Sequence, residues 1–82
     1  MTKYDSYVNI FKKVFHIEDE NKIVKLIYQE NDEWDSVGHM ELISELEDTF
    51  DIEMETEDII DFSSFLKGIE ILNNKYGVGI EK

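Results

Sequence analysis

The hydrophobic positions of this chain recur at helical spacing through most of its length. Over residues 2–16, apolar and aromatic side chains follow one another at intervals of three and four. Because about 3.6 residues complete a helical turn, this spacing places them on one stripe of an α-helix. The stripe consists of Tyr4, Tyr7, Val8, Phe11, Val14 and Phe15.

A second helix is predicted from residue 35 to residue 50, and it has the clearest amphipathic pattern in the sequence. We expect its apolar stripe to face the core and its acids to fall largely on other faces. The stripe consists of Val37, Met40, Ile43, Leu46 and Phe50. The acids are Glu41, Glu45, Glu47 and Asp48.

Two further helices are predicted near the carboxyl end. A short third helix covers residues 56–61, opened by Thr56, and the acids that follow suit the positive end of the helix dipole. A fourth helix has Ser63 as its predicted N-cap and Gly77 just past its end. Its apolar stripe consists of Phe65, Ile69, Leu72 and Tyr76.

Residues 17–34 connect the first two helices and are too many for a structureless connection in a small domain. Their apolar residues are Ile23, Val24, Leu26, Ile27 and Tyr28. We therefore expect this connection to cross the core, with a short helical turn over residues 21–27. The predicted fold is all-α, a small four-helix bundle with a long first connection and a short third helix.

Length and composition predict one domain over residues 1–82. The chain has no cysteine, which excludes a disulfide, a thiolate metal site and a thiol nucleophile and fits a reducing compartment. No apolar stretch approaches the roughly 20 residues that cross a bilayer, and the first residues lack a signal-peptide core. We expect a cytoplasmic domain without membrane insertion.

Charge is the most unusual feature of the composition. Twenty acids face eight bases, giving a net charge of -12, and no base lies between Lys25 and Lys67. Such a field repels nucleic acid and favours encounter with proteins that carry basic patches. The alternative is an acidic face kept for solubility. The acids of this base-free interval are Glu30, Asp32, Glu33, Asp35, Glu41, Glu45, Glu47, Asp48, Asp51, Glu53, Glu55, Glu57, Asp58 and Asp61.

The sequence offers no convincing catalytic or metal site. Asp35, Ser36 and His39 resemble a hydrolase triad, but one exposed helical turn supplies no buried orienting acid, oxyanion hole or cleft. His16 and His39 are predicted to be surface or half-buried side chains. The calcium-loop pattern is missing around residues 32–41, although clustered carboxylates leave loose binding of divalent cations open. We expect no enzyme activity.

The Asp35–Ser36 pair is predicted to begin the second helix, where either side chain can act as the N-cap. If Asp35 is the cap, Ser36 stands at the start of the helix with its hydroxyl toward solvent. A phosphate ester on that oxygen would be favoured by free amides and by the helix dipole. Gly38, less costly in a first turn than in a helix interior, would keep the surface beside the hydroxyl low. This setting suits a serine that is modified.

The segment "DSVGHMELISELEDTFDIEM" resembles the central segment of acyl carrier proteins, where Asp-Ser-Leu opens the second helix and the serine carries a 4'-phosphopantetheine arm. The matching residues run from Asp35–Ser36 through Glu41–Leu42, Leu46–Glu47–Asp48 and Phe50–Asp51 to Glu53–Met54, and more loosely to Ile69. Three positions depart from the family pattern. Val37 replaces the usual leucine, Gly38 stands where an acid is frequent, and Glu55 stands where a proline often precedes the third helix.

The resemblance implies that Ser36 is the attachment site of a phosphopantetheine arm derived from coenzyme A. It implies that Asp35 and Val37 flank the serine for a phosphopantetheinyl transferase and that Met40 lies near the base of the arm. Glu41, Glu47 and Asp48 would help to dock partner enzymes through their basic patches.

The function implied by the resemblance is that of a monomeric carrier. It would hold acyl groups as thioesters and deliver them to acyl-loading or acyl-transferring enzymes of fatty-acid or specialised biosynthesis. Two alternatives stay open: an aminoacyl or peptidyl carrier, and an unmodified acidic helical adaptor that only binds proteins.

Overall fold

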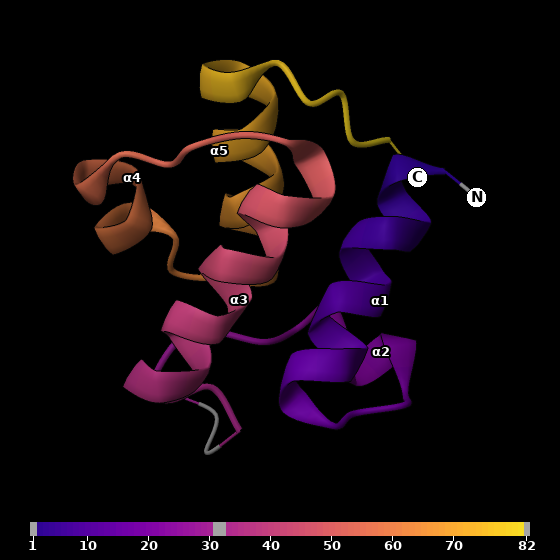
Figure 1. The fold of residues 1–82 in the computed structure, drawn as a ribbon. Helices are drawn as coiled ribbons and strands as arrows, with labels where there is room; N and C mark the ends of the chain where they lie inside the picture. The colour runs from indigo at the N-terminus through magenta and orange to yellow at the C-terminus, as the bar shows by residue number, and fades with distance from the viewer. Residues whose placement is uncertain (1, 31–32, 82) are drawn as a thin grey trace.

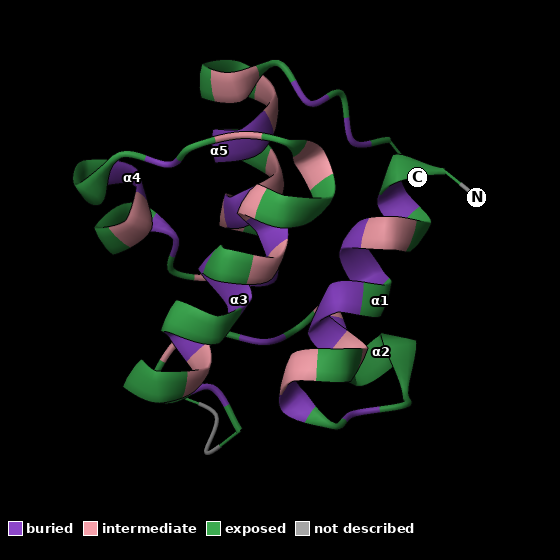
Figure 2. Ribbon diagram, viewed as in Figure 1, coloured by how far each residue is buried: buried purple, intermediate pink, exposed green. Residues whose placement is uncertain are grey.

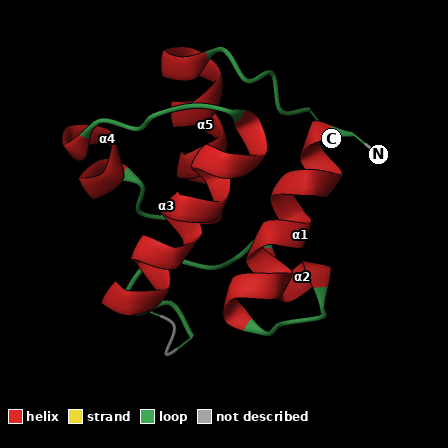
Figure 3. Cartoon of the chain, in the orientation of Figure 1, coloured by secondary structure: helices red, strands yellow, loops and turns green. Residues whose placement is uncertain are grey.

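A computed structural model of the chain describes residues 2–30 and 33–81, and every regular element within them is a helix (Figure 1; Figure 3). The helices are α1 (Lys3–Phe15), α2 (Glu20–Ile23), α3 (Ser36–Phe50), α4 (Thr56–Asp61) and α5 (Phe65–Tyr76). The all-α prediction is confirmed, and the four predicted helices correspond to α1, α3, α4 and α5. Asp32, one of the acids of the base-free interval, lies outside the described residues. Among the described helices, none has the length and apolar character that a bilayer crossing requires.

Helix α1 begins with a reciprocal cap and packs along α3. The Thr2 hydroxyl accepts a hydrogen bond from the Asp5 amide at 3.0 Å, and the Asp5 carboxylate accepts one from the Thr2 amide at 3.3 Å. The helix ends at Phe15, and the C-cap residue His16 adopts a left-handed conformation with φ 57°. Its predicted stripe is buried except for Val14, which is half-buried against the core. The buried stripe belongs to the hydrophobic core, where its rings contact Phe65 of α5, so the predicted core side of α1 is confirmed.

The buried face of α3 is offset from the predicted stripe. Val37 and Met40 are 71% and 57% exposed, and Figure 2 shows exposed residues along the outward side of this helix. Both sets of positions satisfy helical spacing, so the period alone could not choose between them. Packing against α1 distinguishes the two sets, since a Cβ on Gly38 would lie only 2.8 Å from Phe15 Cε1. The residues that face the core are His39, Leu42, Ile43 and Leu46.

The connection between α1 and α3 contains the expected helical turn, but this turn comes earlier than residues 21–27. Asp19 is its N-cap and accepts a hydrogen bond from the Asn21 amide at 3.0 Å. Helix α2 is then only four residues long and ends at Ile23, which is fully buried. A strong local cap therefore sets the start of the turn.

Beyond α2 the connection crosses the start of α5 and pairs with it through the backbone. The Tyr28 amide donates to the Ser63 carbonyl at 2.9 Å, and the Phe65 amide donates to the Leu26 carbonyl at 3.1 Å. Leu26 is buried, so this part of the connection contributes to the core. The prediction that the connection packs on the core is confirmed.

The predicted N-cap of α5 is wrong by one residue. Ser64, not Ser63, caps α5, because its hydroxyl accepts the hydrogen bond from the Lys67 amide at 2.9 Å. Ser63 instead pairs through its carbonyl with the Tyr28 amide. The predicted start of α4 is confirmed: Thr56 is its first helical residue, and Glu55 occupies the N-cap position without a side-chain hydrogen bond.

Helix α5 ends as predicted but turns a slightly different face inward. Gly77 lies just past its end with φ 62°, a conformation that glycine adopts without strain. Ile71 is buried, whereas Ile69 and Tyr76 of the predicted stripe are half-buried. The buried face of α5 is therefore rotated relative to the predicted one.

Aromatic side chains fill the centre of the molecule. The Tyr7 hydroxyl donates a hydrogen bond to the Phe65 carbonyl at 2.7 Å, and burial raises the pKa of Tyr7 well above its ordinary value. Gly68 makes room for this contact, because a Cβ there would collide with the Tyr7 hydroxyl and the Phe62 ring. The fully buried indole of Trp34 completes the cluster. The core thus reaches the residue that precedes the Asp35–Ser36 pair.

Candidate functional site

The Asp35–Ser36 pair lies at the exposed N-terminal end, or head, of α3. Asp35 is the N-cap, and its Oδ1 accepts a hydrogen bond from the Gly38 amide at 2.8 Å. Ser36 is the first helical residue and is exposed, so its hydroxyl takes no part in capping. The Tyr28 hydroxyl donates to Ser36 Oγ at 3.3 Å. The arrangement in which aspartate caps and serine faces solvent is therefore the one that the chain adopts.

The N-terminal end of α3 is held in place by Tyr28, Trp34 and His39. Trp34 Nε1 donates to His39 Nδ1 at 3.0 Å, and His39 Nε2 lies 2.8 Å from the Ile59 carbonyl of α4. Since Nδ1 accepts, Nε2 carries the proton and donates it to Ile59, which defines a neutral imidazole. The Tyr28 ring stacks on this imidazole, with centroids 4.4 Å apart and an interplanar angle of 11°. The connection, α3 and α4 thus meet at one side chain.

His39 is consequently a buried structural residue, and its prediction as a surface or half-buried side chain is wrong. It is only 5% exposed. Both ring nitrogens are engaged by Trp34 and the Ile59 carbonyl, so the imidazole has no free nitrogen to act as a base toward Ser36. The geometry gives no hydrolase triad. His16, in contrast, is exposed as predicted.

An apolar hollow adjoins Ser36 on the outward side of α3. It is lined by Ser36, Val37, Met40, Glu41 and Ser44. Val37 and Met40, which sequence patterning placed in the core, thus lie beside the serine instead. Surface aliphatic groups of this kind are common at binding sites when they gather in one place.

Gly38 has a packing role that differs from the one predicted. A Cβ at this position would lie 2.8 Å from Phe15 Cε1 and 3.2 Å from Asp35 Oδ1. Glycine therefore lets the first turn of α3 approach α1 and leaves the capping carboxylate in place. The position that a Gly38 Cβ would occupy faces the protein interior and not the approach to the Ser36 hydroxyl.

The three acids assigned to partner recognition do not share one environment. Glu41 and Asp48 are exposed on α3. Glu47 is half-buried, and its Oε2 accepts a hydrogen bond from the Met54 amide at 2.9 Å, which fastens the segment that follows α3. Glu41 and Asp48 therefore fit a docking surface better than Glu47 does.

Helix α4 is fastened to α5 by the carboxylate of Asp58, which is only 3% exposed. Lys75 Nζ forms an ion pair with its Oδ1 at 2.8 Å, and the Tyr76 hydroxyl donates to Oδ2 at 2.5 Å. The Lys75 ammonium, followed by the Tyr76 hydroxyl, holds the pKa of Asp58 below its ordinary value. The same pair raises the pKa of Lys75. Because α4 also receives the His39 hydrogen bond, this ion pair helps to position the head of α3.

The Asp58–Lys75 pair predicts a specific dependence of stability on pH. A lowered carboxyl pKa stabilises the fold above the ordinary value of about 3.8, and the effect is lost as pH falls through the lowered value. The raised pKa of Lys75 preserves the pair up to at least its ordinary value of 10.5. Thermal melts of Asp58→Asn should show a melting temperature below the wild type between about pH 5 and 9, and the difference should shrink below about pH 4.

Glu57→Gln is the matched control for this measurement. Glu57 lies 3.8 Å from the same Lys75 ammonium but is 77% exposed, so its loss should change the melting temperature little at any pH. A constant difference between Asp58→Asn and the wild type from neutral to acidic pH would contradict the pair's role.

Comparison with models of known protein families, with curated proteins and with solved structures finds no match for this chain. Within the residues that the structure describes, no three acidic or histidine side chains converge to hold a metal ion. The site must therefore be interpreted from its own geometry. Sequence reasoning missed Tyr28, Trp34 and His39 as its supporting residues, because side chains from three separate segments meet only after folding.

Proposed function

We propose that this chain is an acyl carrier protein whose phosphopantetheine arm is attached to Ser36. The observation that carries the proposal is the exposed Ser36 hydroxyl at the head of α3, left unused for capping because Asp35 is the cap. The resemblance of residues 35–54 to the acyl carrier family supports the same assignment. In this interpretation α1, α3, α4 and α5 form the four-helix bundle of a carrier, and α2 belongs to its long first connection.

The residues around Ser36 suit a covalently attached phosphodiester. The positive end of the α3 dipole favours an anion at this position, and the Tyr28 hydroxyl, 3.3 Å from Oγ, is placed to donate to one of its oxygens. The Asp35 carboxylate is fixed at the N-cap by the hydrogen bond from the Gly38 amide. When bound, the arm supplies a terminal thiol that holds acyl groups as thioesters.

Attachment requires Ser36 Oγ to form a bond to the pantetheine-bearing phosphorus of coenzyme A. The pyrophosphate bond breaks, the nucleotide portion leaves as the bisphosphate, and the serine proton passes to a base of the transferase. The chain itself supplies the nucleophile and its position. Its exposed Val37 and Met40 provide apolar contacts beside the reacting oxygen.

The proposed partners are a phosphopantetheinyl transferase and acyl-loading or acyl-transferring enzymes with basic patches. The net charge of -12 opposes nucleic acid and favours such enzymes. The carrier would act as a cytoplasmic monomer in fatty-acid or specialised biosynthesis. It would perform no chemistry of its own on the cargo.

The test is the intact mass of the protein after incubation with coenzyme A and a broad-specificity phosphopantetheinyl transferase. Addition of one arm supports the carrier. A protein that never gains the arm with any transferase tried, yet still binds basic proteins, would favour the unmodified acidic adaptor. Transfer of an amino acid instead of an acyl group to the attached thiol would identify an aminoacyl carrier.

Charge reversal on α3 should slow partner enzymes without unfolding the chain. Glu41→Lys combined with Asp48→Lys should lower the rate of arm attachment at low salt by about tenfold, because complementary charge mainly raises the association rate. Surface substitutions of this kind usually change stability by less than about 0.5 kcal/mol. Glu47 is left unchanged, since its carboxylate holds the Met54 amide.

The control is the double variant Glu53→Lys and Glu81→Lys, which changes the net charge equally. Both residues are exposed and neither belongs to α3. If both double variants slow attachment to the same extent, net charge and not an α3 docking surface governs the encounter. Rates of the α3 variant equal to wild type at low salt would leave the acidic face with a role in solubility alone.

A further inference from the structure

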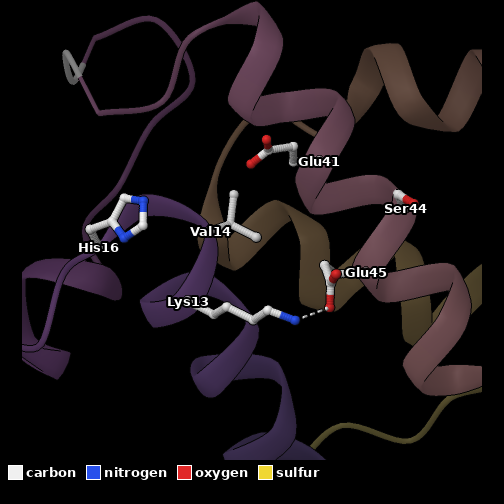
Figure 4. Close-up of a pocket in the computed structure, with 6 residues that line it drawn as sticks. All are labelled: Lys13, Val14, His16, Glu41, Ser44 and Glu45. Atoms are coloured by element: carbon white, nitrogen blue, oxygen red, sulfur yellow. Dashed lines mark hydrogen bonds and ion pairs between the residues drawn. The ribbon is translucent and has the colours of Figure 1, made fainter.

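A groove separates the last turns of α1 from the middle of α3 (Figure 4). It has a volume of about 460 Å³. Figure 4 shows the Val14 side chain between the two helices, with His16 on one side and the Lys13–Glu45 ion pair on another. The lining residues are Lys13, Val14 and His16 from the α1 side and Glu41, Ser44 and Glu45 from α3.

The groove adjoins the apolar hollow beside Ser36. Glu41 and Ser44 line both, so the two depressions are neighbours on the surface of α3. Ser44 stands eight residues after Ser36, which corresponds to about 12 Å along the helix axis. An extended arm as long as a peptide of about five residues spans roughly 16 Å. A flexible group attached at Ser36 can therefore reach the groove without leaving the surface.

The lining offers hydrogen-bond donors and acceptors around an aliphatic centre. Lys13 Nζ lies 3.1 Å from Glu45 Oε1 and supplies a cation that α3 itself lacks. His16 and the Ser44 hydroxyl can donate or accept, Glu41 accepts, and Val14 provides the apolar contact. A purely aliphatic chain laid over the groove would displace water from the exposed His16, Glu41 and Ser44 side chains without replacing its hydrogen bonds. A chain of amides interrupted by methyl groups could replace these hydrogen bonds.

We propose that this groove binds the amide-bearing pantetheine segment of the arm, with the methyl groups of its pantoyl unit against Val14. The thiol end then lies toward the Lys13–Glu45 ion pair. This inference rests on the proposed attachment at Ser36. It assigns the resting position of the arm to the α1–α3 groove, away from α4 and its exposed Ile60.

The test is NMR of the protein before and after attachment of the arm from coenzyme A, with attachment verified by intact mass. We expect nuclear Overhauser effects between the pantoyl methyl protons and the Val14 methyl protons, and shifts of the Ser44 and Glu45 amide signals. Ser44→Tyr fills the groove and should abolish the contacts to Val14. Thr49→Tyr adds the same ring to exposed α3 surface outside this groove and should preserve them.

The outcomes separate this inference from the proposed function. An attached arm that contacts only Met40 or Ile60, or no protein proton at all, overturns the groove assignment while the carrier function stands. Failure of every transferase to add the arm overturns the carrier function, and the groove assignment with it. The spectrum of the wild-type protein alone tests whether the arm lies in the groove. The result therefore does not depend on the folding of Ser44→Tyr.

Discussion

Replacing Ser36 with alanine should abolish attachment of phosphopantetheine and all carrier activity while the protein remains folded. Ser36 is the first residue of α3, is exposed, and leaves the capping hydrogen bond to Asp35. Its loss removes only the contact from the Tyr28 hydroxyl at 3.3 Å. The free energy of unfolding should therefore fall by no more than about 1 kcal/mol, the typical cost of a lost cap. Intact mass after treatment with coenzyme A and transferase measures the first effect, and urea denaturation measures the second.

Ser6 provides the internal control for this variant. It follows Asp5 and precedes an aromatic residue, so it shares half of the motif, but it lies within α1 and is half-buried. A serine within a helix can donate its hydroxyl to a carbonyl of the preceding turn, which leaves it less available to a modifying enzyme. Ser6 should stay unmodified in both proteins. A folded Ser36→Ala protein that still gained one arm would refute the assignment of Ser36.

The helices were predictable because their signals are local. The intervals of three and four in α1, the acids at the start of α4 and Gly77 after α5 all depend on neighbours within a few residues. The same is true of the cap on α3, where Asp35 and Gly38 are three residues apart. The exposed position of Ser36 followed directly from that cap.

The remaining features depend on contacts between distant segments. The predicted and observed buried faces of α3 share Ile43 and Leu46. The close approach of Phe15 to Gly38 accompanies the burial of His39 and Leu42 in place of Val37 and Met40. Ser63 and Ser64 are equally good caps, and the backbone pairing between Ser63 and Tyr28 accompanies the choice of Ser64. Such choices are made by tertiary packing, which local propensity does not encode.

His39 is the strongest example, because no periodicity marks a histidine as part of the core. Replacing it with alanine would leave the buried Trp34 indole N–H and the Ile59 carbonyl without partners. Each unsatisfied buried group costs about 1–3 kcal/mol. We therefore expect His39→Ala to lower the free energy of unfolding by about 3 kcal/mol or more. Urea denaturation followed by far-UV circular dichroism measures this free energy. Circular dichroism is preferred to Trp34 fluorescence, because the fluorescence would also respond to the lost contact between Trp34 and residue 39.

The His39→Ala variant should also disturb the site around Ser36 under conditions in which the protein is still folded. Without the imidazole, the Tyr28 ring loses its stacking partner and α4 loses its link to the head of α3. Arm attachment at Ser36 should then be slower under conditions where the variant is still folded. His16→Asn is the matched control: His16 is exposed in a left-handed turn that asparagine tolerates, so stability should change by less than about 0.5 kcal/mol. Equal unfolding free energies for the two histidine variants would show that the Trp34–His39–Ile59 hydrogen bonds do not hold the head of α3.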